Sequence, residues 1–252
     1  MGKTALITGA TSGIGEATAV RLARRGFDLI VTGRRCARLR ELKKKLEAAH
    51  GIEVLPLSFD VRDRHQCEAA IDSLPEAFRR IDVLVNNAGL AAGLEHIDEG
   101  DPNDWDRMID TNIKGLLYIT RKVAQGMVAQ GAGHIVNIGS IAGSEVYENG
   151  AAYCASKHAV HALSQGMRID LLRHGIRVTE IRPGMVETEF SIVRFDGDAD
   201  RAANVYKGVK PLTANDVART VCWAISQPAH VNVSEIVLMP TQQADAFYTH
   251  RK

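Results

Sequence analysis

The chain has 252 residues, of which 45% are apolar and 24% charged, and its formal net charge is +1. This composition is typical of globular proteins and excludes the collagen, coiled-coil and disordered classes. The near balance of charges and an aromatic content of only 5% argue against a nucleic-acid or membrane partner.

Short apolar segments alternate with longer amphipathic segments along the chain. This pattern predicts strands at Thr4–Thr8, Asp28–Thr32, Glu53–Ser58, Val83–Asn86, His134–Ile138, Arg177–Ile181 and Ser234–Leu238. It predicts helices near residues 13–25, 35–49, 63–79, 102–130, 150–174 and 214–226. Most of the strands are apolar without interruption, which is typical of strands covered on both faces. The sequence therefore predicts one α/β domain, residues 1–252, with a parallel sheet and helices on both faces.

Three local signals add detail to this outline. Asp101 with Asp104, and Thr213 with Asp216, have the spacing of capping boxes at two helix starts. The stretch around 185–212 is the least regular part of the chain, polar and spaced by glycines. A long loop of this kind predicts a lid over a substrate site.

The cysteines and the apolar segments indicate the compartment. No apolar run is long enough to cross a bilayer, and the N-terminal apolar run is too short for a secretory signal. The four cysteines contain no CxxC pair, which fits buried thiols in a reducing environment. We therefore expect a cytoplasmic protein.

The first predicted strand leads into a glycine-rich turn and then a helix. Gly9 permits a tight turn, Gly13 permits backbone to approach a pyrophosphate, and Gly15 permits close packing of helix on strand. The position between strand and helix favours a dinucleotide site over an ordinary turn. The other loop residues expected to contact the cofactor are Thr11, Ser12 and Ile14.

The ends of the next strands carry further candidates. Arg34 and Arg35 stand where an acidic residue would bind a ribose 2′-hydroxyl, and two guanidiniums suit a 2′-phosphate instead. NADP(H) is therefore preferred over NAD(H), although solvated first-turn arginines remain an alternative. Asp60 and Val61 follow the third strand and are candidates for the adenine edge. Asn86–Gly89 follows the fourth strand, where small residues keep the wall beside a cofactor thin, and a simple turn is the alternative.

A second cluster contains the residues suited to chemistry. Tyr153 and Lys157 are four apart in a predicted helix and so share one helical face. A nearby ammonium stabilises phenolate, which would lower the tyrosine pKa and suit Tyr153 for acid/base work on an alcohol–carbonyl couple. Ser140, at the end of the fifth strand, would hydrogen-bond the same substrate oxygen. The amide of Asn112 would hold a water that links Lys157 to solvent.

Together these motifs resemble those of the classical short-chain dehydrogenase/reductase family. The matching positions, in family order, are Thr8–Gly15, Asn86–Gly89, Asn112, Ser140, Tyr153, Lys157, Pro183–Gly184 and Thr188. The resemblance implies a Rossmann-type doubly wound domain with a seven-stranded parallel sheet, a nicotinamide cofactor and an Asn-Ser-Tyr-Lys tetrad. It implies that Lys157 binds the nicotinamide ribose and Thr188 the carboxamide. The cofactor residues that it implies beyond the glycine loop are Asn87, Gly89, Tyr153, Lys157, Pro183, Gly184, Val186 and Thr188.

A narrower resemblance is to the bacterial NADP-dependent 3-hydroxy acid dehydrogenases. It is carried by Thr32–Arg35, Ile109–Leu116, Glu187–Ser191, Val193–Phe195 and Pro228–Asn232. That subgroup acts on serine, allo-threonine and related hydroxy acids and reduces malonic semialdehyde, and closely similar enzymes reduce sulfoacetaldehyde. The resemblance also implies a homotetramer.

We therefore expect an NADP(H)-dependent oxidoreductase that acts on a small 3-hydroxy acid through Ser140 and Tyr153. Arg194 is the candidate anchor for the substrate carboxylate, with a solvated lid residue as the alternative. A sulfoacetaldehyde reductase or a broad reductase of neutral carbonyls remains open. A regulator that senses NADP(H) without turnover is the alternative from another class, and the intact Tyr/Lys pair argues against it. We expect no metal site, because His158 and His161 have no third ligand at a recognisable spacing.

Overall fold

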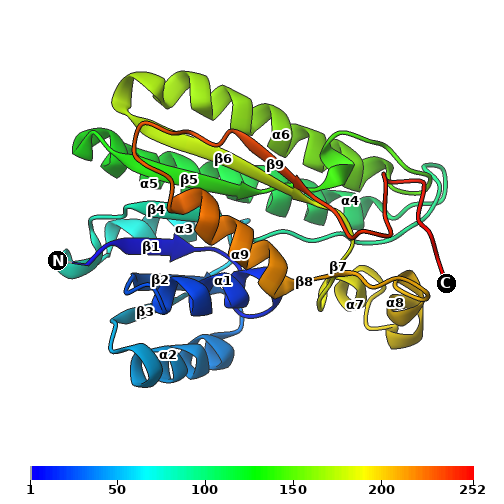
Figure 1. The fold of residues 1–252 in the computed structure, drawn as a ribbon, viewed down its shortest axis with the longest axis horizontal. Coiled ribbons are helices and arrows are strands. Elements are labelled where there is room, and N and C mark those ends of the chain that lie inside the picture. The colour runs from blue at the N-terminus through cyan, green and yellow to red at the C-terminus, as the bar shows by residue number, and fades with distance from the viewer. Residues whose placement is uncertain (1) are drawn as a thin grey trace.

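The computed structural model describes residues 2–252 and contains a wholly parallel sheet with the strand order β3-β2-β1-β4-β5-β6-β9 (Figure 1). Its strands are β1 (Thr4–Ile7), β2 (Asp28–Gly33), β3 (Val54–Ser58), β4 (Val83–Asn86), β5 (Gly133–Ile138), β6 (Ile176–Pro183) and β9 (Glu235–Leu238). All seven predicted strands are confirmed across the described residues, with ends that shift by one or two positions. The strand order reverses between β1 and β4, and a ligand crevice forms at such a point.

Helices cover both faces of the sheet because successive strand residues point to opposite sides (Figure 1). Ala5 and Ile7 of β1 belong to one apolar core, and Leu6 between them belongs to the other. The first core includes side chains of α1 (Gly13–Ala23), α2 (Cys36–His50) and α9 (Ala214–Ile225). The second includes side chains of α3 (Arg64–Asp72), α5 (Leu116–Gln130) and α6 (Ala151–Leu171). The uninterrupted apolar character of the strands follows from this double coverage.

One of the two predicted capping boxes forms. Thr213 accepts from the Asp216 amide, and the Asp216 carboxylate accepts from the Thr213 amide. Asp101 caps α4 (Pro102–Ile109) by accepting from the amide of Asn103. The predicted reciprocal contact of Asp104 is wrong, because its carboxylate accepts from Arg107 at 2.8 Å instead.

Two predicted helices are interrupted. The prediction of one helix over 63–79 is wrong in its second half: α3 ends at Asp72, and a short 3₁₀ turn follows at Glu76–Phe78. Pro75 lies between them, and proline cannot donate a helical hydrogen bond. The predicted helix 102–130 consists of α4 and α5 joined by a π-helical segment, Asp110–Gly115.

The segment 185–212 is more ordered than its sequence predicts. It contains two short helices, α7 (Phe190–Arg194) and α8 (Ala199–Val205). A strand at its beginning, β7 (Val186–Glu187), pairs in parallel with β8 (Leu212–Thr213) at its end. In Figure 1 these elements lie beyond the carboxyl ends of the main strands.

Throughout residues 2–252, no helix has both the length and the apolarity to cross a bilayer. All four cysteines are free in this part of the chain, and those at 67, 154 and 222 are buried, while Cys36 is partly exposed.

His134 on β5 makes folding sensitive to acid. Burial, assisted by the charge of Arg177, lowers the pKa of His134 to about 3, whereas an unfolded histidine titrates near 6.5. Between these values only the unfolded chain binds this proton, so the free energy of unfolding falls as the pH falls. We expect acidification from pH 7 to pH 5 to remove about 2 kcal/mol through this one residue.

Urea denaturation of the wild type and of His134→Gln at both pH values measures this contribution. The variant should be less stable at pH 7, because it disturbs a buried hydrogen bond to Thr179, but it should lose less stability on acidification. Equal losses in the two proteins would show that His134 does not carry the effect.

Candidate active site

A cavity of about 610 Å³ opens at the carboxyl ends of the central strands. It is bordered by nearly all of the residues predicted for the site. These are Gly9, Thr11, Ser12, Gly13, Ile14, Arg34, Arg35, Asp60, Val61, Asn87, Gly89, Ser140, Tyr153, Lys157, Pro183, Gly184, Val186, Thr188 and Arg194. Gly15 and Asn112 lie outside the cavity lining and act on it only through neighbours.

The turn after β1 is shaped by glycines that no other residue could replace without strain. Gly9 and Gly13 have positive φ angles of 66° and 55°. A Cβ atom at Gly15 would overlap the carbonyl oxygen of Gly9 and lie 2.5 Å from the Asn87 amide nitrogen. The turn therefore offers bare backbone to the cavity at the start of α1, as a pyrophosphate requires.

Asn87 holds this turn in place. Its side-chain amide donates to the carbonyl oxygens of Thr8 at 2.9 Å and Gly9 at 3.1 Å. The Thr8 hydroxyl in return accepts from the backbone amides of Asn87 and Ala88. The loop after β4 thus braces the glycine turn as well as lining the cavity.

The two arginines after β2 differ in how many protein groups their guanidiniums contact. The side chain of Arg34 is 62% exposed, and its closest charged neighbour is Asp60 at 4.0 Å. Arg35 is folded onto the glycine turn and donates to the hydroxyls of Thr11 and Ser12 at 2.7–3.0 Å. Of the predicted pair, Arg34 is the guanidinium whose donors remain open to a phosphate.

The structure brings Tyr153, Lys157 and Ser140 together beside the cavity. The ammonium of Lys157 lies 5.9 Å from the centroid of the Tyr153 ring and donates to the Ile138 carbonyl at 2.9 Å. Tyr153 and Lys157 are 9% and 6% exposed, so a substrate bound there is shielded from water. Ser140 lies immediately after β5 and caps a short 3₁₀ turn.

Burial dominates the ionisation of both groups. It raises the pKa of Tyr153, chiefly by desolvation, while a hydrogen bond from Ser140 and the charge of Arg194 oppose the rise. Burial also lowers the pKa of Lys157 to about 8, against the opposing charge of Glu180. The expected lowering of the Tyr153 pKa is wrong for this structure, because loss of hydration outweighs the hydrogen bond from Ser140 and the charge of Arg194.

The Asn112 amide is bonded mainly to protein groups. Its nitrogen donates to the Leu90 carbonyl at 2.8 Å and the Ser156 hydroxyl at 3.0 Å, and its oxygen accepts from the Leu90 amide. Both N–H donors are thus used, so only the second lone pair of the oxygen could bind a water, and that role stays a prediction. Asn112 ties the π-helical segment to α6 and to the loop after β4.

Arg194 of α7 reaches into the cavity between two tyrosines. Its guanidinium carbon lies 5.6 Å from the Tyr147 ring centroid and 5.8 Å from that of Tyr153. Its Nε donates to the Gly93 carbonyl at 3.1 Å and its Nη1 to the Tyr147 hydroxyl at 3.2 Å. Nη2 is buried and finds no hydrogen-bond partner among residues 2–252. Because protein groups hold this guanidinium in place, the geometry favours an anchor over a solvated lid residue.

Sequence reasoning missed Tyr147, which holds Arg194. The only available signal was an aromatic residue within the acidic segment Ser144–Asn149. The two carboxylates of that segment have partners of their own: Glu145 accepts from the Ala246 amide, and Glu148, which borders the cavity, lies 3.7 Å from the exposed His96.

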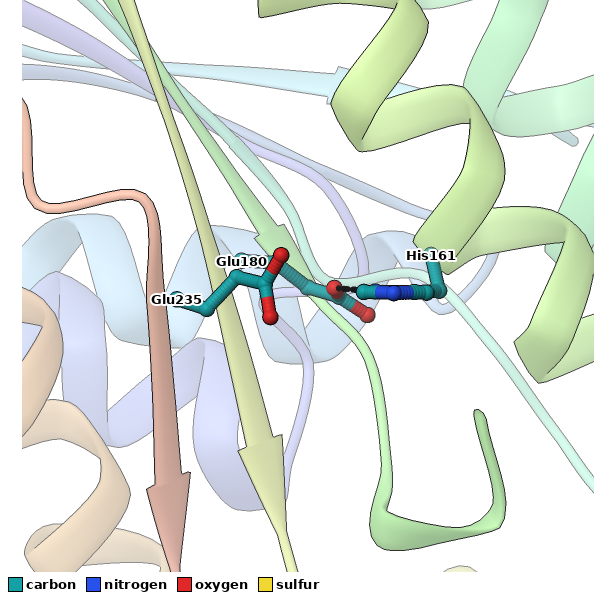
Figure 2. A group of neighbouring side chains, drawn as sticks. All are labelled: His161, Glu180 and Glu235. Atoms are coloured by element: carbon teal, nitrogen blue, oxygen red, sulfur yellow. Dashed lines mark hydrogen bonds and ion pairs between the residues drawn. The ribbon is translucent and has the colours of Figure 1, made fainter. Parts of the chain in front are cut away.

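A separate polar group surrounds His161 (Figure 2). Figure 2 shows Glu180 between His161 and Glu235, and the Nδ1 atom of His161 lies 2.6 Å from the Glu180 carboxylate. The two carboxylates come from β6 and β9, so the spacing of residues along the chain could not reveal them. Arg182 donates to Glu235 at 2.8 Å and lies 4.0 Å from Glu180. The guanidinium of Arg182 already neutralises part of this negative charge, which weakens the case for a cation at this group.

Comparisons with known proteins agree with this geometry. Residues 3–198 match the family model described as short chain dehydrogenase. An NADP-dependent 3-hydroxy acid dehydrogenase, YdfG, of Salmonella typhi is 48% identical over 96% of this chain and 96% of its own. Sulfoacetaldehyde reductase 2 of Chromohalobacter salexigens is 47% identical over 95% of this chain and 94% of its own. The closed form of a serine dehydrogenase complexed with NADP⁺ superposes with a TM-score of 0.93, at 45% identity over 99% of this chain and 100% of its own.

Proposed function

The chain belongs to the short-chain dehydrogenase family, and from this premise we propose that it is an NADP(H)-dependent oxidoreductase that interconverts a small 3-hydroxy acid and its carbonyl form. Substrates of the serine, allo-threonine and 3-hydroxypropionate type fit this class. The observation that carries the substrate class is the guanidinium of Arg194, whose carbon lies 5.8 Å from the Tyr153 ring centroid and whose Nη2 has no protein partner among the described residues. A carboxylate supplies the partner that this donor lacks.

The cavity fits NADP(H) by its shape and its charge. The glycine turn presents backbone that side chains would block, and the exposed Arg34 suits a 2′-phosphate. Gly9, Thr11, Ser12, Gly13, Ile14 and Gly15 would hold or shape the pyrophosphate site, and Asp60 and Val61 the adenine side. The other proposed cofactor residues are Arg35, Asn87, Gly89, Tyr153, Lys157, Pro183, Gly184, Val186 and Thr188.

Within this site we assign the catalytic roles to Asn112, Ser140, Tyr153 and Lys157. When bound, the nicotinamide supplies the hydride acceptor or donor. In oxidation, ionised Tyr153 takes the proton of the substrate hydroxyl, and in reduction its phenol returns a proton to the carbonyl oxygen. Ser140 fixes that oxygen by a hydrogen bond. Lys157 supplies positive charge near the phenol, and Asn112 positions the helix that carries Lys157 by bonding to Ser156.

Arg194 provides the test of the substrate class. In Arg194→Ala a 3-hydroxy acid loses its charged partner, so we expect its KM to rise by about 10–100-fold. The KM of a neutral alcohol of similar size should change by less than about threefold. Steady-state kinetics with D-3-hydroxybutyrate, L-serine and a neutral secondary alcohol measures the difference.

A matched control is Arg201→Ala. Arg201 lies in the same segment, over the ring of Phe195 at 4.6 Å, and is exposed outside the cavity. It should leave both KM values near those of the wild type. Equal losses for acidic and neutral substrates in Arg194→Ala would remove Arg194 from the substrate site.

A sulfonate substrate is the second candidate, because Arg194 would bind a sulfonate as well as a carboxylate and a relative of 47% identity is named sulfoacetaldehyde reductase 2. A panel of NADPH-coupled assays with sulfoacetaldehyde, malonic semialdehyde and neutral carbonyls separates these activities. Binding of NADPH without turnover of any of them would favour the sensing regulator.

The remaining features complete this proposal. We propose that residues 1–252 form one dinucleotide-binding and catalytic domain, with the segment 185–212 as its substrate lid. We also propose a homotetramer in the cytoplasm. The helices α4–α6 support the assembly, because Ile109, Leu117, Ile169 and Leu172 expose 38–75% of their apolar surface.

A further inference from the structure

One carboxylate of the segment 185–212 is bonded to two arginines of another part of the chain. Glu189 follows Thr188, between β7 and α7. Its Oε2 accepts from Nη1 of Arg35 at 2.7 Å, and its Oε1 accepts from Nη1 of Arg38 at 2.7 Å. Both arginines lie at the start of α2, more than 150 positions away in sequence.

The same arginines hold the glycine turn. Arg35 donates to the hydroxyls of Thr11 and Ser12, and Arg38 is 3.4 Å from the Thr11 carbonyl oxygen. Ser12, Arg35 and Glu189 all border the cavity. A chain of polar contacts therefore runs from the segment 185–212 to the glycine turn across the mouth of the cavity.

The segment and the turn also approach each other directly. A Cβ atom placed on Gly13 would meet the side chain of Thr188 at 3.4 Å. The carboxylate next to Thr188 thus holds the segment at a point where it lies beside the glycine turn.

The negative charge of this contact persists into acid. Hydrogen bonds from Arg35 and Arg38 lower the pKa of Glu189 to about 2. The side chains are each 40–47% exposed, so dissolved salt weakens the attraction. Two arginines on one carboxylate form a small network, which is stronger than an isolated surface pair.

We propose that Glu189, Arg35 and Arg38 form a clasp, which positions the segment 185–212 over the bound dinucleotide. The clasp thereby slows dissociation of the dinucleotide. The clasp rests on the proposed function, because it spans the groove assigned to NADP(H). Glu189 and Arg38 are positioning residues in this scheme: they act on the cofactor through the backbone segments that they connect. Arg34 then serves as the principal 2′-phosphate ligand, since Arg35 is engaged by Thr11, Ser12 and Glu189.

The clasp predicts the same effect on the binding of both nicotinamide dinucleotides. In Glu189→Gln and in Arg38→Gln we expect the dissociation rate and Kd of NADPH and of NADH to rise by the same factor, about three- to tenfold. The double variant should be no worse than Glu189→Gln alone, because that substitution already removes the charge that both Arg35 and Arg38 contact. Stopped-flow fluorescence gives the rates, and equilibrium titration gives Kd.

Salt and a control variant sharpen the measurement. Raising NaCl should speed release from the wild type more than from the double variant. Glu76→Gln removes an exposed carboxylate that pairs with Arg79 away from the cavity, and it should leave release unchanged.

Other outcomes overturn the clasp. If Glu189→Gln lowers the Kd of NADPH and leaves the Kd of NADH unchanged, Glu189 competes with the 2′-phosphate for the arginines and does not hold the segment over the groove. Unchanged binding of both dinucleotides, or strictly additive effects in the double variant, also overturns it. Failure of the wild type to bind either dinucleotide would overturn the proposed function itself, and that result is distinct from the others.

Discussion

Tyr153→Phe is expected to lower kcat by about 10²–10⁴-fold or more and to leave NADPH binding nearly unchanged. The substitution removes only the hydroxyl that exchanges a proton with the substrate oxygen. The ring would keep its edge-to-face contact with Phe190, whose centroid lies 5.7 Å away. Single-turnover kinetics with saturating NADPH, together with titration of NADPH fluorescence, separates the chemical step from binding.

The matched control is Tyr248→Phe, which removes a hydroxyl from a tyrosine residue that is 67% exposed. It should retain wild-type kcat. Turnover by Tyr153→Phe at more than a tenth of the wild-type rate would mean that another group moves the proton. Burial raises the pKa of Tyr153 and so favours the neutral phenol, which is the form that donates a proton in reduction.

Gly15→Ala should weaken NADPH binding by at least about tenfold and lower the free energy of unfolding by about 1–3 kcal/mol. The added Cβ would collide with the backbone of Gly9 and with the amide of Asn87. Neither group can retreat easily, because Asn87 is bonded to two carbonyl oxygens of the turn. The turn must therefore move, and with it the backbone that faces the pyrophosphate.

Gly126→Ala is the matched control, since it makes the same chemical change in the exposed interior of α5. Its nearest contact would be the end of the Gln130 side chain at 3.8 Å. We expect this variant to bind NADPH normally and to gain about 0.5–1 kcal/mol of stability, because alanine loses less entropy in a helix. Normal NADPH binding by Gly15→Ala would show that the turn tolerates a side chain there.

The sheet could be predicted from sequence because its strands are covered on both faces. Double coverage makes strands such as Val83–Asn86 almost entirely apolar, and such runs are easy to recognise. The prediction of one helix over 63–79 failed in its second half. The amphipathic pattern continues past Pro75, but the helix ends before it because proline cannot donate the backbone hydrogen bond. The π-helical segment left no trace in the pattern, because one wider turn hardly disturbs the apolar spacing of a long helix.

Prediction of the site succeeded where residues are close in sequence and failed where distant segments meet. Tyr153 and Lys157 are one helical turn apart, so spacing alone places them on one face. The partners of Asn112 and Arg35 come from other elements, and sequence spacing contains no information about them. The direction of the Tyr153 pKa shift depends on burial, which requires the packed structure.

The π-helical segment Asp110–Gly115 makes the number of residues in this helix as important as their identity. Each residue of a helix advances the chain by about 100° around its axis, so losing or gaining one here would rotate all of α5. Its apolar stripe, which includes Ile119, Val123 and Met127, would then turn away from the sheet. Chimeras assembled from relatives with different helix lengths would therefore need crossover points outside residues 102–130.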